Sequence, residues 1–152
     1  MPPATNDVTV RVAHERDLAA LLGLYALLSD ETRTTAPSEA ERRALGDVLA
    51  DRRQRLFVAE RAGAVVGSVT LIVVTNLTHD GRPYGIIENV VVREDARRGG
   101  IGAALMREAI AAAREAGCYK VALTSNMRRA EAHAFYERLR FVTTQRAFRL
   151  DV

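Results

Sequence analysis

The chain has 152 residues, 48% of them hydrophobic and 27% charged, with a formal net charge of +3 at pH 7. This size and composition predict a single domain over residues 1–152 with one core, in which residues 1–6 form a flexible tail. The scattered arginines lack interleaved aromatic side chains, and no stretch reaches the ~18 apolar residues of a membrane helix, so neither nucleic acid nor a membrane is an expected partner.

The first third of the chain predicts a strand and two helices. Valines alternate with polar residues over residues 8–12, which is typical of a strand. Leucines at helical spacing predict a helix over about residues 14–28. A polar loop then leads to Ser38, and Glu41 three residues later completes a capping box that predicts a second helix over residues 38–54.

A β-hairpin is expected in the middle of the chain. The apolar runs 56–59 and 64–75 are separated by residues 61–63, Arg-Ala-Gly, which have the composition of a tight turn. Gly67 within the second run indicates a β-bulge or the close approach of another backbone segment.

The strand expected at residues 84–92 is apolar on both faces apart from two polar residues, so it belongs in the centre of the sheet. After it, the pattern predicts a helix over residues 100–116, a strand over 119–124 and a last helix over about 129–139. Residues 141–152 are expected to supply one terminal strand or two very short ones. This order of elements predicts an α/β domain with a mixed sheet.

The turn between the central strand and the next helix has the features of a diphosphate site. Glycines let the backbone approach a phosphate closely, and the amides of a first helical turn lack intrahelical partners. The turn lacks the third glycine of a dinucleotide fingerprint and the lysine of a P-loop, which leaves the pattern Arg-x-x-Gly-x-Gly. The alternative is a tight turn whose glycines serve geometry alone. The residues of this turn are Arg97, Arg98, Gly99, Gly100, Ile101, Gly102 and Ala103.

Glu88 lies within the apolar strand 84–92, on a face that it is expected to share with Ile86, Val90 and Val92. Burying a carboxylate without a partner is costly, so Glu88 must reach water, a partner or a cleft. It is a candidate general base, and the alternative is a salt bridge to a neighbouring arginine.

Two residues near the end of the chain are further candidates. Tyr136 lies about 100° around the last expected helix from Phe135, so its phenol is a candidate proton donor, while a core tyrosine is the alternative. Asn126 follows the strand 119–124, at the kind of strand end where α/β proteins bind ligands. Its amide is a candidate for binding a polar cofactor group, and a turn or a helix cap is the alternative.

Cys118 is the only cysteine, so neither an internal disulfide nor a cysteine metal cluster is expected. A single cysteine fits a reducing compartment, and the N-terminus lacks the pattern of a signal peptide. We therefore expect a cytoplasmic protein.

Together these residues resemble the GNAT superfamily of acyl-CoA-dependent N-acyltransferases. The family pattern Gln/Arg-x-x-Gly-x-Gly/Ala is similar to Arg97, Gly100 and Gly102 here. One departure is Arg140, which stands where the family usually has glycine. A second family pattern, Asn followed by Ala-x-x-Phe/Leu-Tyr-Glu-x-x-Gly-Phe, resembles Asn126, Ala132, Phe135, Tyr136, Glu137 and Phe141.

The resemblance implies a single-domain α/β (α+β) fold with about four helices, whose mixed, mostly antiparallel sheet splays open between strands 84–92 and 119–124. It also implies that the diphosphate belongs to coenzyme A, with no metal, and that amides of residues 98–103 bind it. The pantetheine arm would then pair with the central strand as an added strand does. The implied cofactor-binding residues are the turn residues Arg97 to Ala103, together with Val90, Val91, Val92, Asn126 and Tyr136.

The resemblance further implies an N-acetyltransferase that transfers an acetyl group from acetyl-CoA directly to the primary amine of a small molecule. Glu88, directly or through water, would take the proton of the amine, a strand amide near Val90 would stabilise the oxyanion, and Tyr136 would protonate the departing thiolate. The alternatives are a protein lysine or N-terminal acetyltransferase and a non-catalytic acyl-CoA-binding regulatory module. The early end of the chain leaves the final hairpin either truncated or completed by a partner subunit in a homodimer.

Overall fold

The computed structural model describes residues 7–152, so the tail expected at residues 1–6 lies outside the described residues. The chain forms two compact units, Met1–Ala122 and Leu123–Val152. The single domain over residues 1–152 stays a prediction.

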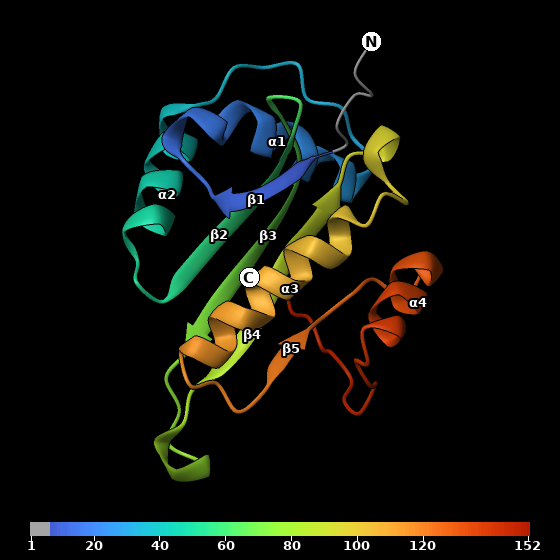
Figure 1. Cartoon of the computed structure of the whole chain (residues 1–152). Helices are drawn as coiled ribbons and strands as arrows, with labels where there is room; N and C mark the ends of the chain where they lie inside the picture. The colour runs from blue at the N-terminus through green and yellow to red at the C-terminus, as the bar shows by residue number, and fades with distance from the viewer. Residues whose placement is uncertain (1–6) are drawn as a thin grey trace. The chain divides into compact units, whose positions relative to one another are not determined.

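The first unit is built on a sheet with the strand order β1-β2-β3-β4-β5 (Figure 1). β1 to β4 pair antiparallel, and β5 adjoins β4 to complete a mixed sheet. The strands are β1 (Val8–Val12), β2 (Gln54–Arg61), β3 (Ala64–Val74), β4 (Tyr84–Val92) and β5 (Val121–Leu123), whose last residue opens the second unit. The helices are η1 (Glu15–Asp17), α1 (Leu18–Ala26), η2 (Leu27–Ser29), α2 (Glu39–Ala50), η3 (His79–Gly81), η4 (Glu94–Ala96) and α3 (Ile101–Glu115).

Helices pack on both faces of this sheet. The Tyr25 hydroxyl in α1 lies 3.4 Å from Ser68 Oγ on one face of β3. Gly67, the preceding residue of β3, lies against Leu105 and Ile101 of α3. Because successive strand residues point to opposite faces, α1 and α3 cover opposite sides of the sheet. The core on the α1 side also includes α2 and β2, through Ala13, Leu18, Leu21, Leu45, Leu56 and Val58.

The predicted capping box is confirmed at the start of α2. Ser38 Oγ accepts a hydrogen bond from Glu41 N at 3.2 Å, and the Glu41 carboxylate accepts one from Ser38 N at 2.8 Å. The helix ends at Ala50, four residues earlier than expected. The Asp51 carboxylate accepts a hydrogen bond from the Arg53 amide at 2.9 Å, and this local turn leads the chain into β2.

The predicted hairpin is also confirmed, with Ala62 and Gly63 in its turn at φ values of 50° and 78°. Both expectations for Gly67 hold. The β2–β3 register shifts beside it, and a Cβ on Gly67 would lie 3.1 Å from the Val91 carbonyl oxygen and 3.0 Å from Leu105 Cδ1. A glycine is therefore favoured at this position of β3, where β4 and α3 approach closely.

The second unit contains α4 (Ala130–Arg138), close to the predicted bounds. The strand expected at 119–124 is shorter, and the strand expected at 141–152 is wrong, because the structure assigns none there. The Phe141 amide donates to the Tyr136 carbonyl at 3.0 Å and so closes α4, and the side chains beyond it are exposed. A strand needs a partner for its backbone groups, and these residues have none within the described part of the chain.

Within residues 7–152, the expected α/β fold with four α-helices and a mostly antiparallel mixed sheet is confirmed. None of the described helices combines the length and the apolar composition that crossing a membrane requires.

Candidate active site

The turn before α3 presents backbone amides at the start of the helix. Gly100 is the N-cap residue of α3 and has a left-handed φ of 77°, and no side chain of the described residues caps the helix there. Gly100 thus turns the chain in a conformation that disfavours side chains. The amides of Ile101 and Gly102, in the first turn of α3, have no intrahelical acceptor and are available to an anion.

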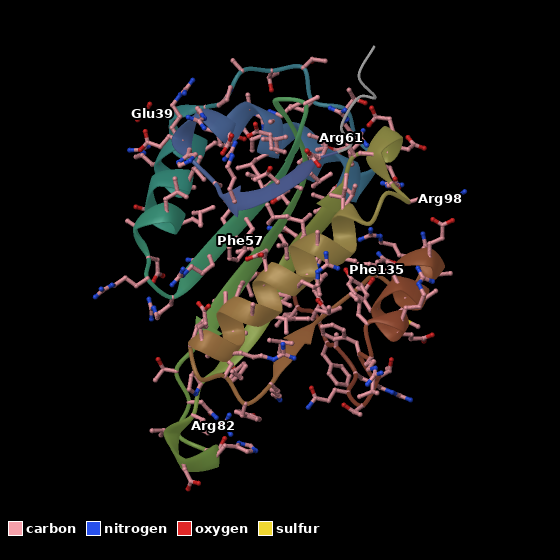
Figure 2. All side chains as sticks on the ribbon, in the orientation of Figure 1. Glu39, Phe57, Arg61, Arg82, Arg98 and Phe135 are labelled. Carbon is pink, nitrogen blue, oxygen red and sulfur yellow. The ribbon has the colours of Figure 1, made fainter. Side chains whose placement is uncertain are left out.

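The two arginines of this turn have different surroundings. Arg97 Nε donates a hydrogen bond to the Val92 carbonyl at 3.1 Å, which fastens the turn to the end of β4. Arg98 has a left-handed φ of 64°, and its exposed side chain extends outward from the turn (Figure 2). The free amides, the left-handed glycine and the arginine charge all fit a diphosphate group at this position.

A second irregularity of the sheet lies beside Glu88. Thr70 of β3 pairs with Glu88, and Ser68 pairs with Val91, so two steps along β3 match three steps along β4. The extra residue makes a β-bulge at Asn89, whose φ is 51°. Asparagine tolerates this left-handed conformation better than most residues do.

The bulge decides which way Glu88 points. Thr70 and Ser68 lie on the same face of β3, the face covered by α1, so Glu88 and Val91 lie on that face too. Val92 pairs with Gly67 and belongs to the α3 face. The expected shared face of Glu88 with Val90 and Val92 is therefore wrong, because the extra residue reverses the alternation after Glu88.

Three hydroxyl residues surround this part of the α1 face, and the sequence patterns did not single them out. Ser68 and Thr70 are buried, with exposed fractions of 0% and 7%, and Tyr25 of α1 lies against them. Burial raises the pKa of the Tyr25 phenol, while hydrogen bonds with Ser68 and Thr70 act in the opposite direction. The sequence signal that could have identified Ser68 and Thr70 is their position, two residues apart in an otherwise apolar strand.

Asn126 lies in the second unit, in the turn before α4. Its Oδ1 accepts a hydrogen bond from the Arg128 amide at 2.9 Å, and its carbonyl accepts one from the Arg129 amide at 3.0 Å. The side-chain oxygen of Asn126 therefore stabilises a turn, as the alternative interpretation of this residue predicts. The cofactor contact stays a prediction, and the amide nitrogen is the group that remains for it.

Tyr136 is a buried residue of α4. Its ring lies 5.3 Å from that of Phe135 and 6.0 Å from that of Phe141, in tilted and edge-on arrangements. Burial raises the pKa of the phenol, and the positive charge of Arg129 acts in the opposite direction. The phenol is thus protonated at neutral pH, as a proton donor must be, and it also belongs to an aromatic cluster.

The first unit brings together the predicted base, the strand residues beside it and the whole glycine turn. Asn126 and Tyr136 lie together in the second unit, one in the turn before α4 and the other within the helix. The proposed base and the proposed acid thus come from different units of the chain.

The sequence model of the acetyltransferase (GNAT) family matches residues 21–141, which include β4, the glycine turn and α4. This chain belongs to the GNAT acetyltransferase family. The resemblance seen in the glycine turn is thereby confirmed at the level of the family.

Curated relatives and a solved structure agree with this assignment. The chain is 34% identical over 152 residues to the glucosamine 6-phosphate N-acetyltransferase of Trypanosoma brucei brucei, covering 96% of this chain and 97% of the relative. It is 32% identical over 115 residues to the aminoalkylphosphonate N-acetyltransferase of Salmonella typhimurium, covering 76% and 74%. A putative acetyltransferase from Agrobacterium tumefaciens superposes with a TM-score of 0.87 at 38% identity, covering 95% and 99%. The GNAT chain is therefore an N-acetyltransferase.

Proposed function

We propose that this GNAT enzyme transfers the acetyl group of acetyl-CoA to the primary amine of a small molecule. The observation that carries the proposal is the start of α3, where no described side chain caps the helix and which follows the Glu88 strand β4 after the short helix η4. The two curated relatives are named for acetylating an amino sugar phosphate and aminoalkylphosphonates, both of which combine an amine with an anionic phosphorus group.

The glycine turn would hold the diphosphate of coenzyme A. Amides of residues 101–103 would donate to it, and Arg97 and Arg98 would add positive charge. Backbone groups of β4 at residues 90–92 would pair with the pantetheine arm, and Asn126 Nδ2 would bind close to it. When bound, acetyl-CoA supplies the activated acyl group.

Glu88 would prepare the acceptor. An alkyl ammonium has a pKa near 10.4 and attacks only after losing a proton. The Glu88 side chain is partly exposed, so it can take that proton directly or through water. The bulge at Asn89 leaves the backbone groups of one residue without a partner on β3, which supports an oxyanion-stabilising amide near Val90.

Tyr136 would return a proton to the departing thiolate. Its protonated phenol suits this role, since burial raises its pKa. Burial also raises the pKa of the Cys118 thiol, which keeps that side chain out of the reactive thiolate form. The unreactive thiol supports a direct transfer without an acyl-enzyme on this side chain.

An amine panel with acetyl-CoA, followed by release of free thiol, tests the proposal. We expect turnover with glucosamine 6-phosphate or 2-aminoethylphosphonate and little with lysine peptides. Tyr136→Phe and Glu88→Gln should each lower kcat by roughly 10- to 10⁴-fold while coenzyme A still binds. Tyr119→Phe, which removes a phenol outside the proposed site, is the matched control and should leave kcat unchanged.

Two results would contradict this function. Tight binding of coenzyme A without thiol release from any amine would favour a binding module. Turnover with lysine peptides alone would favour a protein acetyltransferase. Unchanged turnover in Tyr136→Phe, measured where chemistry limits the rate, would remove Tyr136 from the mechanism.

We also propose that the enzyme works as a homodimer in the cytoplasm. Phe148 and Leu150, at alternate positions of the C-terminal segment, have exposed fractions of 93% and 85%, which supports association with a second chain. The single cysteine supports a reducing compartment. Light scattering during size-exclusion chromatography would detect the dimer, and a monomer at micromolar concentration would contradict it.

A further inference from the structure

Ser68 and Thr70 are buried hydroxyl residues in a strand that is otherwise apolar. A buried hydroxyl is unfavourable unless it finds a hydrogen-bond partner. Tyr25 supplies one, since its hydroxyl lies 3.4 Å from Ser68 Oγ and also interacts with Thr70. Ser68 and Thr70 therefore fix the position of the Tyr25 phenol. These three residues are called the hydroxyl cluster.

The hydroxyl cluster adjoins Glu88. Thr70 and Glu88 are directly paired on antiparallel strands, so their Cβ atoms lie about 5 Å apart on the same face. α1 covers this face, and both α1 and the following helix η2 pack against β4. Tyr25 and Glu88 therefore border the same region of the α1 face.

The hydrogen count of the cluster leaves one donor for a ligand. Each hydroxyl has one hydrogen to donate and can accept from others. Tyr25 is the middle member, and when Ser68 and Thr70 both donate to its oxygen, the hydrogen of Tyr25 is left for a ligand. Ser68 and Thr70 are buried, whereas Tyr25 is partly exposed and can reach a ligand. Its phenol is protonated at neutral pH, since burial raises its pKa.

We infer that Tyr25 is a specificity-determining residue of the acceptor site, which binds a hydroxyl group next to the carbon that carries the acceptor's amine. This inference rests on the proposed function, because it places the amine at Glu88. Ser68 and Thr70 act through Tyr25 as positioning residues. The preferred acceptors are then amino alcohols, such as amino sugar phosphates, over simple aminoalkyl compounds.

The test compares two acceptors in steady-state kinetics of Tyr25→Phe. Glucosamine 6-phosphate carries hydroxyls beside its amine-bearing carbon, and 2-aminoethylphosphonate carries none. We expect KM for glucosamine 6-phosphate to rise about 10-fold, because one hydrogen bond to the acceptor is lost. KM for 2-aminoethylphosphonate and for acetyl-CoA should stay within about twofold, which also shows that the variant is folded.

Two further variants sharpen the result. Tyr84→Phe removes a phenol that packs near Lys120 and Tyr119, and it should leave both acceptors unchanged. Ser68→Ala keeps Tyr25 but removes one of its hydrogen-bond partners. It should therefore raise the KM for glucosamine 6-phosphate by a smaller factor than Tyr25→Phe does.

Three outcomes overturn the inference. They are an equal rise of KM for both acceptors, a fall in kcat without any change in KM, and a wild-type enzyme that acetylates the phosphonate but not the sugar. A wild-type enzyme that acetylates no amine instead contradicts the proposed function, and this is known before any variant is compared.

Discussion

Arg140 adopts a left-handed conformation directly after α4, with a φ of 70°. Its amide donates to the Glu137 carbonyl at 2.9 Å, and the Phe141 amide donates to the Tyr136 carbonyl at 3.0 Å. These two bonds form a Schellman motif at the end of the helix. The family's usual glycine has a physical reason here, because glycine adopts this conformation without a Cβ penalty.

Replacing Arg140 by glycine should stabilise the protein. The relief of left-handed strain exceeds the entropy that glycine adds to the unfolded chain, so we expect a gain of about 0.5–1 kcal/mol. Urea unfolding measures this difference. Arg138→Gly, within the last turn of α4, should instead lower the unfolding free energy by up to about 1 kcal/mol. A loss of stability in Arg140→Gly would show that the arginine side chain compensates for its strain.

At the scale of elements, side chains of β3 and β5 pack tightly over Gly85 of β4. A Cβ on Gly85 would lie 2.9 Å from Leu71 Cδ1, 3.0 Å from Val121 Cγ1 and 3.6 Å from Ala113 Cβ. The absence of a side chain at Gly85 therefore makes room for side chains of β3 and β5, with α3 in ordinary contact. Gly46, within α2, has no such neighbours, because a Cβ there would meet no side chain of the described residues within 4 Å.

The same substitution should thus have opposite effects at these two glycines. Gly85→Ala crowds a closely packed layer and should lower the unfolding free energy by about 1–3 kcal/mol. Gly46→Ala should raise it by about 1 kcal/mol, since alanine favours a helix interior. Thermal unfolding of both variants distinguishes the two cases, and a shift in the same direction would contradict this packing.

Across the first unit, one ion-pair network joins the beginning of the chain to the hairpin. Arg11 of β1 contacts the Asp17 carboxylate at 2.7 Å and that of Glu60 in β2 at 2.8 Å. The Asp17 carboxylate also accepts the His14 amide at 2.8 Å. The hydrogen bond from Arg11 is the main reason that the pKa of Asp17 lies below its ordinary value. The same contacts raise the pKa of Arg11.

This network predicts how stability depends on pH. The lowered pKa of Asp17 gives stability that is present above the ordinary carboxylate pKa of about 3.9 and is lost as the pH falls through the lower, folded value. Asp17→Asn should cost about 2–4 kcal/mol at pH 7 and flatten the acid limb of the stability curve. Asp95→Asn, which removes the exposed partner of Arg93, should leave stability at pH 7 almost unchanged. Identical acid limbs in wild type and Asp17→Asn would contradict the role of Asp17.

Local chemistry made much of this molecule predictable. The capping box at Ser38, the hairpin turn at residues 61–63 and the glycine turn each depend on residues within a few positions of one another. Their structures follow from short-range hydrogen bonds and backbone preferences, and the family resemblance depends on the same segments. The prediction of a C-terminal strand was wrong because a strand depends on a partner strand, which a local sequence pattern does not supply.

The sequence by itself determined the order of elements as far as α4, the glycine turn before α3 and the family. Only the tertiary structure decided the face of Glu88, since that face depends on how β4 pairs with β3 around the bulge at Asn89. The same pairing brought Thr70 beside Glu88, and the packing of α1 on β3 placed Tyr25 against Ser68, 43 positions away along the chain. A shift of one residue in strand register exchanges the two faces, and such a shift arises from long-range pairing that no local pattern encodes.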